Sequence, residues 1–509
     1  MLWIALHLPL LSLESFAATL PEKTREQAVA LMDVHRIVSA NGAAQALGVK
    51  PGLKRATALA LAPQITLGQA DAARDAQAIA SVAHAALAFT PSVTLEPCGD
   101  AACASHTVLL EVQSSLRYFG GRHKLLRRLR AAVAALQHTV NCASAPTAQG
   151  AALLARMEDA PDGLHAADLA SLACRVDSAP VWLLGPGREH WDALQGMGLR
   201  TCSDLRHLPR AGVARRFGEP LLDELDRALG ARPDPRAWVT LPETFESRLE
   251  LFARADTTEQ VLHGAALLLA RLVAWATAQH AQVRRFTLHM QHEARHRHDA
   301  QTPADSTLEI ALAEPSRDAA HLLVLLRERL AHLQLPAPTL ELRLHCSDIA
   351  RRAPPNGELF PTAQSDREGL TRLIERLQAR LGREQVQRLT AVEDHRPERA
   401  SAVCAADAAR ASFATAPQPA TPTLRPAWLL PHPEPLPERQ LRPLLDGRPL
   451  QLLCGPERIE AGWWDAALAE RDYFIAQTTD GALVWIYRAR LPLSASSQEQ
   501  GWFLQGRFG

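Results

Sequence analysis

The sequence lacks three features that would place a protein in a class at once. Its eight cysteines are scattered and form no C-x-x-C pair, which excludes a disulfide-rich secreted scaffold and favours a reducing cytoplasm. Its 55 basic and 55 acidic side chains cancel, so any contact with nucleic acid must come from local patches. No apolar run approaches the ~20 uninterrupted residues of a membrane span, so no membrane partner is predicted.

Two enzyme classes are excluded because their motifs are missing. No stretch has the G-x-x-x-x-G-K-[ST] spacing with which a nucleotide hydrolase cradles phosphate. No G-x-S-x-G elbow marks the nucleophile of a serine hydrolase, and no cysteine stands in a compelling histidine context.

What is present is an ordinary globular composition over a long chain. Hydrophobic residues make up 47% and charged residues 22% of the 509, which fits roughly three to four domains with sizeable cores. The apolar start is interpreted either as a signal peptide or as a buried strand over residues 2–8. It has no basic start, and His7, Pro9 and Glu14 interrupt it, so the strand is favoured.

The first third of the chain has an α+β pattern. Apolar spacing predicts helices over residues 26–47, 54–61 and 70–89, followed by a strand pair near residues 93–96 and 108–112. A further helix over residues 122–136 begins with a run of basic side chains, which is the common pattern of a solvated face. These side chains are Arg122, Lys124, Arg127, Arg128 and Arg130.

Residues 181–230 change to short helices joined by tight turns. Gly196 and Gly198 lie in a turn between two apolar stretches, and Thr201 follows as a helix cap, which predicts two helices folded on a hairpin. Such a hairpin either binds phosphate through its backbone N–H groups or is only a packing corner.

Residues 246–350 have the pattern of a second α+β unit. Helices are predicted over residues 258–278 and 318–333, with strands over residues 284–290 and 339–345. Arg284 and Arg285 begin the first strand, where they could grip a duplex backbone or keep an edge strand soluble. The cluster His289, His292, His296 and His298 has no spacing that fixes a coordination geometry, and no metal is predicted.

The last part of the chain contains an amphipathic helix, a linker and an aromatic module. Ser365 and Glu368 form a predicted capping box for a helix that ends at Gly382, with a leucine stripe expected to pack. Residues 399–437 are rich in proline and predict a semi-extended linker. The aromatic-rich segment 438–509 has turn signals at Gly455-Pro456 and Asp480-Gly481, which predict short antiparallel strands.

Three segments in order resemble the Y-family translesion DNA polymerases. Residues 39–52 (SANGAAQALGVKPG) resemble their fingers, and residues 196–218, from the glycine hairpin to RRFG, resemble their thumb. The unit at 246–350 stands where their little finger would be. Residues 110–121, with LRYFGG, and the terminal GPERIEAGWWD at 455–465 resemble more narrowly a catalytically degenerate branch, the polymerase-like subunit of a bacterial damage-induced mutagenesis complex.

The resemblance implies an α+β multidomain fold with the parts of a Y-family polymerase and an added C-terminal module. The implied divisions are a palm (1–25 and 68–175), fingers (26–67), a helix-hairpin-helix thumb (176–240), a little finger (241–350), a clamp-binding peptide with the amphipathic helix (351–398), the linker (399–437) and a partner-binding module (438–509).

The resemblance also implies that the metal ligands of the family are missing. Phosphoryl transfer needs carboxylates that hold two Mg²⁺ ions about 4 Å apart. Ala5, His106 and Thr107 stand at the positions of those carboxylates, and none can replace them. Leu10 stands at the aromatic sugar gate. Gly42 and Gln45 stand at the tyrosine and arginine that would hold the triphosphate.

Two functions follow from this alignment. The first is a non-catalytic adaptor without a cofactor that keeps the DNA-holding thumb and little finger. It would use Gly196, Gly198, Arg200, Thr201, Arg215, Arg216, Arg284 and Arg285. The second is an active translesion polymerase with rearranged carboxylates. Its candidate acids are Glu14, Glu96, Asp100 and Glu111.

Partners of the adaptor are implied at two places. Asn356, Leu359 and Phe360 resemble a degenerate sliding-clamp-binding peptide, although the Leu-Phe pair could also dock on this protein's own surface. The terminal module would bind a RecA-like accessory protein and a DnaE-type error-prone polymerase that performs the synthesis. Its candidate contact residues are Trp463, Trp464, Tyr473 and Trp485.

Overall fold

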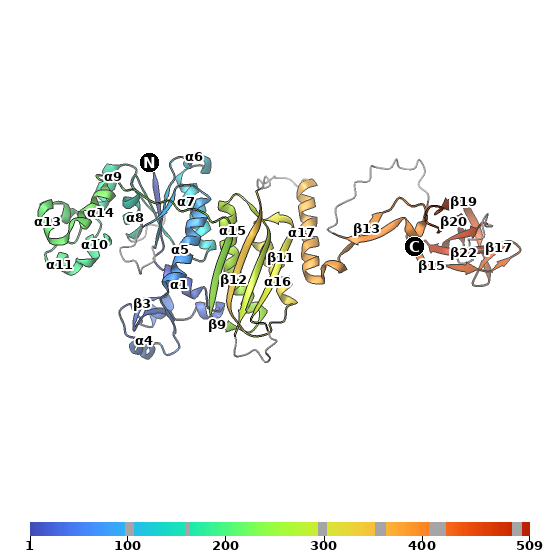
Figure 1. The fold of residues 1–509 in the computed structure, drawn as a ribbon, viewed down its shortest axis with the longest axis horizontal. Helices are drawn as coiled ribbons and strands as arrows, with labels where there is room; N and C mark the ends of the chain where they lie inside the picture. Colours follow the sequence, from blue (N-terminus) through green and yellow to red (C-terminus); the bar gives the residue numbers. More distant parts are fainter. Residues whose placement is uncertain are drawn as a thin grey trace. The chain divides into compact units, whose positions relative to one another are not determined.

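The computed structural model describes residues 1–96, 106–157, 163–293, 303–351, 363–406, 424–490 and 501–508. The chain divides into two compact units, Met1–Arg380 and Leu381–Gly509. The first mixes helices with three sheets, and the second is built mainly of strands. The α+β multidomain architecture expected from the sequence is therefore confirmed (Figure 1).

The N-terminal strand lies in the middle of a five-stranded sheet with the order β5-β6-β1-β7-β8, called here the palm-like sheet. Its strands are β1 (Trp3–His7), β5 (Val93–Leu95), β6 (Thr107–Glu111), β7 (Asn141–Ala145) and β8 (Leu164–His165). β1 pairs antiparallel with both β6 and β7. The buried strand predicted at residues 2–8 and the predicted strand pair are confirmed.

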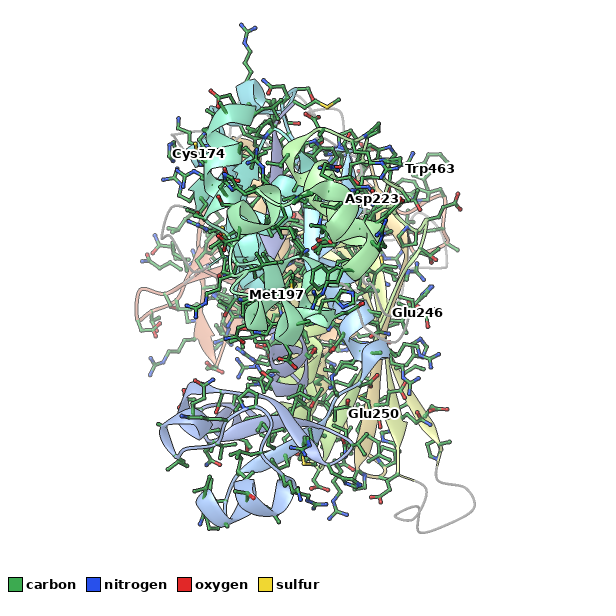
Figure 2. All side chains as sticks on the ribbon, turned by 90° about the vertical axis from the view of Figure 1, so that its left-hand side faces the viewer. Cys174, Met197, Asp223, Glu246, Glu250 and Trp463 are labelled. Atoms are coloured by element: carbon green, nitrogen blue, oxygen red, sulfur yellow. The ribbon has the colours of Figure 1, made fainter. Side chains whose placement is uncertain are left out.

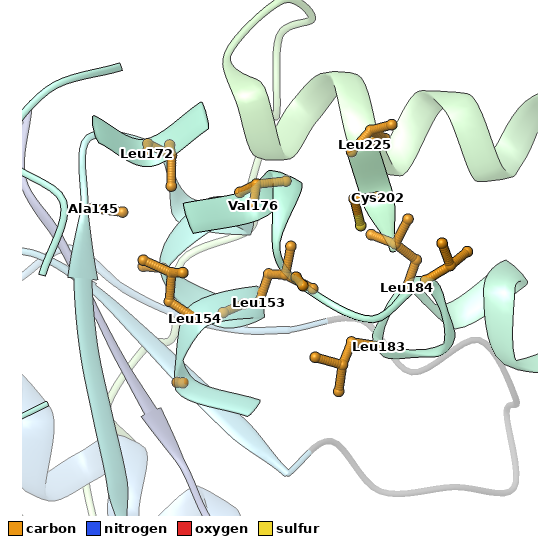
Figure 3. Packing of buried hydrophobic residues seen from close by; sticks show 14 of the residues in the cluster. Ala145, Leu153, Leu154, Leu172, Val176, Leu183, Leu184, Cys202 and Leu225 are labelled. Carbon is orange, nitrogen blue, oxygen red and sulfur yellow. The ribbon is translucent and has the colours of Figure 1, made fainter. Parts of the chain in front are cut away.

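Both faces of the palm-like sheet are covered, because the side chains of β1 alternate between two cores. Ile4 and Leu6 pack with α5 (Ala72–Leu87) and α7 (Arg122–Ala135). Trp3 and Ala5 pack on the opposite face, with α8 (Ala148–Arg156). This second core continues without a break into the helices that follow α8, as Figure 3 shows for Leu154, Val176 and Leu225.

Residues 26–67 correct one prediction. The helix expected over 26–47 is wrong, because the segment forms β2 (Val29–Asp33), β3 (Arg36–Ala40) and the short α3 (Gly42–Ala46). Val34 has a φ of 51° at the tight turn between the two strands. The apolar run of β2 is buried, and a short buried run cannot be assigned to helix or strand by its periodicity. β2 pairs with β4 (Thr66–Gln69), and α4 (Arg55–Leu61) matches its prediction.

The thumb-like helices cover residues 169–229 and confirm the predicted series of short helices. They are α9 (Leu169–Asp177), the 3-10 helix η1 (Val181–Leu183), α10 (Gly185–Glu189), α11 (Trp191–Gly196), α12 (Cys202–Arg206), α13 (Arg210–Phe217) and α14 (Glu219–Leu229). Thr201 caps α12 as predicted, in a capping box with Asp204.

The little-finger-like unit is a four-stranded antiparallel sheet with the order β11-β10-β12-β9, backed by two helices. Its elements are β9 (Phe245–Ala255), α15 (Thr258–Ala278), β10 (Gln282–His292), β11 (Asp305–Ser316), α16 (Ala319–Ala331) and β12 (Thr339–Ala350). β10, which carries Arg284 and Arg285, is an interior strand. Protection of an edge strand therefore does not explain these two arginines.

Among the described residues, α15 is the one helix long and apolar enough to span a membrane. It packs against β9 and β12, and also against α5 and α16, so most of its circumference meets protein (Figure 1). This packing accounts for its apolar composition.

The amphipathic helix α17 (Ala363–Leu381) forms, but the face that packs against the protein is not the predicted one. It begins two residues before Ser365, so Ser365 lies inside its first turn and is not its cap. Glu375 is buried and accepts hydrogen bonds from the N–H of Ala313 (2.6 Å) and from the His321 ring (2.8 Å). The predicted leucine stripe, Leu370, Leu373, Leu377 and Leu381, is exposed.

The second unit contains a five-stranded sheet with the order β15-β22-β21-β20-β19, called here the terminal sheet. Its strands are β15 (Trp428–Leu436), β19 (Gln451–Ala461), β20 (Ala469–Gln477), β21 (Leu483–Ala489) and β22 (Gly501–Arg507). The remaining elements are η3 (Arg383–Gln385), β13 (Gln387–Ala391), η4 (Pro397–Arg399), β14 (Ser401–Ala405), β16 (Glu438–Arg439), β17 (Arg442–Leu445) and β18 (Arg448–Pro449).

Two predictions for this unit need correction. The linker predicted at 399–437 is wrong at both ends, because β14 pairs with β13 and β15 joins the terminal sheet. Gly455-Pro456 is not a turn between strands but lies within β19, where the register with β20 shifts. The turn at Asp480-Gly481 is confirmed between β20 and β21.

Candidate functional site

The position of the first expected metal ligand lies inside the protein core. Ala5 is fully buried in the middle of β1, opposite Leu109 on β6 and Ala143 on β7. Its side chain belongs to the apolar core beneath α8. Ala5, which the resemblance aligns with the family's first metal-binding carboxylate, therefore packs as part of the core.

Two histidines and a threonine occupy the end of the same strand pair. His7 Nδ1 lies 3.0 Å from Thr107 Oγ1, and His106 precedes β6. Burial, reinforced by the Arg156 guanidinium, lowers the pKa of His7 to about 4. Burial also lowers the pKa of His106. Both rings are neutral near pH 7 because the arginines and the low-dielectric surroundings disfavour added positive charge.

The positive charge near these rings comes from two arginines. Arg156 lies at the C-terminus of α8, and Arg188 lies on α10 of the thumb-like helices. Arg188 acts on both His7 and His106 by lowering their pKa values. Asp75 acts on His106 in the opposite direction, and Arg156 is ion-paired with Glu96, so carboxylates partly balance the two arginines.

Among the described candidate acids, Glu96 lies at this strand end, where its N–H donates to the carbonyl of Thr107 at 3.0 Å. Glu14 accepts a hydrogen bond from the N–H of Thr139 (2.9 Å), and its bonds with His138 and Thr139 outweigh burial and lower its pKa. Glu96 is ion-paired with Arg156. Glu111 ends β6 opposite Trp3, at the far end of the pairing from His7.

Asp100, the fourth candidate, lies outside the described residues. Within the described ranges, no group of three or more His, Cys, Asp or Glu side chains is arranged to hold a metal ion. His292, from the predicted histidine cluster, instead contacts Ser306 Oγ (2.7 Å) and Thr339 Oγ1 (3.2 Å). His296 and His298 lie outside the described residues.

The residues at the expected nucleotide-binding positions make only local contacts. Leu10 packs against the small apolar cluster around Phe16. Gly42 is the first residue of α3, and a side chain there would meet nothing within 4 Å. Gln45 Nε2 donates to the carbonyl of Ala40 at 2.8 Å. None of the three supplies a cation that could hold a triphosphate.

The thumb hairpin forms as predicted, but its backbone donors are engaged. Gly198 has a φ of +80°, which favours glycine at this turn. The N–H groups of Arg200 and Thr201 donate to the Asp204 carboxylate at 3.0 and 2.9 Å. Gly196 ends α11, and Met197, labelled in Figure 2, is partly exposed. A phosphate would have to compete with Asp204 for these amides.

Arginine side chains offer a more available anion contact on the same helices. Arg215 and Arg216 lie in the last turn of α13, and both are exposed, as is Arg200. Over the described part of the chain, these three form no ion pair, whereas Arg206 is paired with Asp177. These exposed guanidinium groups are therefore candidates for phosphate contacts.

The open face of the little-finger-like sheet is electrically balanced. Arg285 lies 3.2 Å from Glu309 and 3.8 Å from Asp348. Arg248 is 2.7 Å from Glu341. Arg343 is paired with Glu246 and Glu341 in the same way. Arg284 is exposed and forms no ion pair within the described ranges, so the two adjacent arginines of the prediction differ in their availability.

The four aromatic residues proposed for partner binding separate into two groups. Trp463 and Trp464 lie between β19 and β20 and are 79% and 54% exposed. Tyr473 and Trp485 are buried, with ring centroids 4.2 Å apart. Tyr473 and Trp485 therefore form core rather than contact surface, and this part of the prediction is corrected.

A buried arginine holds the exposed tryptophan segment. Arg396 is 2% exposed and donates to Asp465 (2.7 Å), Asp394 (2.6 Å) and the carbonyl of Ala467 (2.9 Å). Its guanidinium carbon lies 5.5 Å from the Trp464 ring centroid. The sequence predicted residue 396 to lie ahead of the linker and gave no sign that Arg396 binds the tryptophan segment. The candidate clamp-binding residues Asn356, Leu359 and Phe360 lie outside the described residues.

The comparisons with known proteins give one family match, two curated relatives and several solved structures. Residues 12–156 match the impB/mucB/samB family. Two proteins named ImuB, from strains of Caulobacter vibrioides, are each 28% identical over 483 residues, which is 91% of this chain and 100% of theirs. DinB from Sulfolobus solfataricus and a Dbh ternary complex align at 16% identity and a TM-score of 0.38, covering 69% of this chain and 99% of theirs. Residues 12–156 therefore match the impB/mucB/samB family, and the chain is ImuB-like over 91% of its length.

Proposed function

We propose that this chain is a non-catalytic, DNA-binding adaptor of translesion synthesis. The observation that carries the proposal is the strand end at His7. There Ala5 packs in the core, both histidines are neutral near pH 7, and Arg156 and Arg188 add positive charge. Two Mg²⁺ ions need several hard carboxylate ligands, and the candidate acid at this strand end, Glu96, is already ion-paired with Arg156.

DNA binding in this proposal depends on the thumb-like helices. Arg200, Arg215 and Arg216 carry exposed guanidinium groups without an ion-pair partner in the described part of the chain. Guanidinium contacts to phosphate need no catalytic acid and carry no base sequence information. We therefore expect salt-sensitive binding that does not depend on base sequence.

The recruitment role is proposed from the resemblance to ImuB proteins together with the exposed tryptophans. Trp463 and Trp464 present a large aromatic surface, and such residues often dominate protein interfaces. We assign to the terminal unit the binding of a RecA-like accessory protein and a DnaE-type error-prone polymerase. We assign to Asn356, Leu359 and Phe360 the binding of a sliding clamp, all in damage-induced mutagenesis in the cytoplasm.

Primer extension and DNA binding with one preparation test the proposal. With Mg²⁺ or Mn²⁺ on a primed template, we expect no nucleotide addition but binding that weakens as salt rises. In Arg215→Ala/Arg216→Ala the slope of log affinity against log salt should fall by about 2. Arg206→Ala is the matched control, because Arg206 is already paired with Asp177, and it should leave the slope nearly unchanged.

The alternative function is an active polymerase with rearranged carboxylates. Nucleotide addition that is lost in Glu14→Gln, Glu96→Gln or Glu111→Gln would contradict the adaptor proposal and establish this alternative. Salt-independent binding, or binding unaffected by the thumb variants, would instead contradict the assigned DNA surface.

A further inference from the structure

A cavity of about 470 Å³ lies where three parts of the first unit meet. The start of α5 contributes one wall through Arg74, and β4 contributes a second through Gly68. β9 of the little-finger-like sheet contributes a third through Phe252, and Arg271 of α15 also lines the cavity. A volume of this size falls within the usual range for small-molecule sites.

The lining contains a buried cation that lacks a counter-ion. Arg271 is 4% exposed, and its one recorded hydrogen bond runs from Nη1 to Ser247 Oγ at 3.1 Å. Among the described residues, no carboxylate forms an ion pair with it. Burial lowers the pKa of Arg271 to about 10, so the side chain stays charged at neutral pH. A buried charge without a partner is costly, and a bound anion would offset that cost.

A second guanidinium on the wall has donor capacity left. Arg74 donates through Nη2 to the carbonyl of Gln69 at 2.8 Å, while its buried Nε has no hydrogen-bond partner. Burial lowers the pKa of Arg74, whereas Asp75, Asp71 and Glu250 favour its charged form. Asp71 and Glu250 also line the cavity. The Asp71 carboxylate accepts from the N-terminal amides of α5, and Glu250, labelled in Figure 2, is an exposed residue of β9.

The aromatic wall pairs the buried Phe16 with Phe252, which is 52% exposed. Phe16 and Phe252 meet edge to face with ring centroids 5.2 Å apart, and Arg74 lies 5.4 Å from the Phe16 centroid. A Cβ atom at Gly68 would come within 2.4 Å of the Phe16 ring, so glycine is required there for this ring position. The cavity thus combines the buried guanidinium group of Arg271 with an aromatic surface.

We propose that this cavity binds a phosphate monoester, with the phosphate on Arg271 and Arg74 and the attached group against the aromatic wall. A free nucleotide and the terminal phosphate of a DNA strand share this chemistry. Either ligand would contact β9 on one side and α5 and β4 on the other. The site is separate from the thumb arginines, so the proposal does not depend on the function proposed above.

Calorimetric titration of the full chain with three probes tests the proposal. The probes are inorganic phosphate, a nucleoside monophosphate, and a short oligonucleotide with or without a 5′-phosphate. We expect the native chain to bind phosphate and at least one of the two larger probes. In Arg271→Met the affinity should fall about 10-fold or more, because a charge-assisted contact is lost. Arg327→Met, an exposed arginine on α16, is the matched control and should leave the affinity unchanged.

Two further results guard against a folding artefact. Arg271→Met without ligand should be at least as heat-stable as the native chain, because it removes an unpaired buried charge. Glu250→Gln should strengthen phosphate binding, because it removes like charge from the lining. Failure of the native chain to bind any probe, equal binding by Arg271→Met, or weaker binding by Glu250→Gln would each overturn the proposal. Preference for the nucleotide over the phosphorylated strand, or the reverse, identifies the source of the phosphate.

Discussion

At the scale of single residues, His7 links the unusual charge of the strand end to a measurable property. Its ordinary pKa is 6.5, and burial in the folded chain lowers it to about 4. Between these values the unfolded chain binds more protons, so the free energy of unfolding should decrease as pH falls from 6.5 to 4. A pKa difference of this size corresponds to on the order of 3 kcal/mol.

Chemical denaturation at several pH values measures this effect. In His7→Gln the loss of stability on acidification should be smaller than in the native chain by that amount. His35→Gln, at an exposed position in the fingers-like hairpin, serves as the control and should behave like the native chain. Identical pH profiles for His7→Gln and the native chain would mean that His7 titrates alike in both states.

Residue identities revealed what the strand end lacks but not what surrounds it. The absence of acids at Ala5 and Thr107 could be read from the sequence, because a carboxylate is either present or missing at an aligned position. The influence of Arg156 and Arg188 on His7 could not be read from the sequence, because these arginines lie on α8 and α10 and come close to His7 only in the folded chain. The spacing of Thr201 and Asp204 is that of a capping box and accounts for the bond to the Thr201 amide, but the second bond, to the Arg200 amide, has no such local signal.

At the scale of elements, the open face of the little-finger-like sheet is expected to hold DNA weakly. Each of its ion pairs places a carboxylate beside an arginine that would otherwise contact phosphate. Glu309→Gln frees Arg285 from its nearer partner at 3.2 Å. DNA affinity should therefore rise, and the slope against log salt should steepen by about 1.

Fluorescence anisotropy with a labelled duplex over a salt series checks this expectation. Glu328→Gln is a suitable control, because Glu328 faces Arg376 of α17 and not the sheet. An affinity in Glu309→Gln equal to that of the control would show that this face does not meet DNA.

Element assignment succeeded where one period dominated a long segment. The predicted helices at α5 and α7 agree with the structure to within two residues at each end. The prediction of a helix over residues 26–47 failed because a buried strand and a short helix both present apolar clusters. β11 was missed although Leu308, Ile310 and Leu312 alternate along it, which is the signal that could have found it.

At the scale of the whole molecule, the order of the polymerase-like parts was recognisable from motifs, but the extent of the last unit was not. Proline-rich composition predicted a linker up to residue 437. Proline is tolerated on an edge strand, and β15 is the outer strand of the terminal sheet. Arg396 bonds to Asp465, between β19 and β20, and Glu398 bonds to Gln505 of β22. These partners are about 70 and 110 positions apart, and no local pattern records such contacts.

The extent of the terminal unit leads to a prediction about fragments. A fragment of residues 438–509 lacks β15 and the buried Arg396, and it leaves Arg471 and Gln505 without Glu398, their partner at 3.0 and 2.9 Å. We expect it to show no cooperative thermal transition by circular dichroism. Residues 381–509 keep all of these contacts and should unfold in one transition.

Matched variants of the longer fragment separate folding from binding. Trp463→Ala should keep the transition, because that side chain is 79% exposed, whereas Arg396→Ala should lower its midpoint. Loss of the Arg396 contacts also releases Asp465, whose hydrogen bond with Arg396 lowers its pKa to about 2. The longer fragment should therefore lose stability as pH falls from about 4 towards 2, and Arg396→Ala should weaken that dependence. An equally stable 438–509 fragment would instead mean that the tryptophan segment is held by the terminal sheet alone.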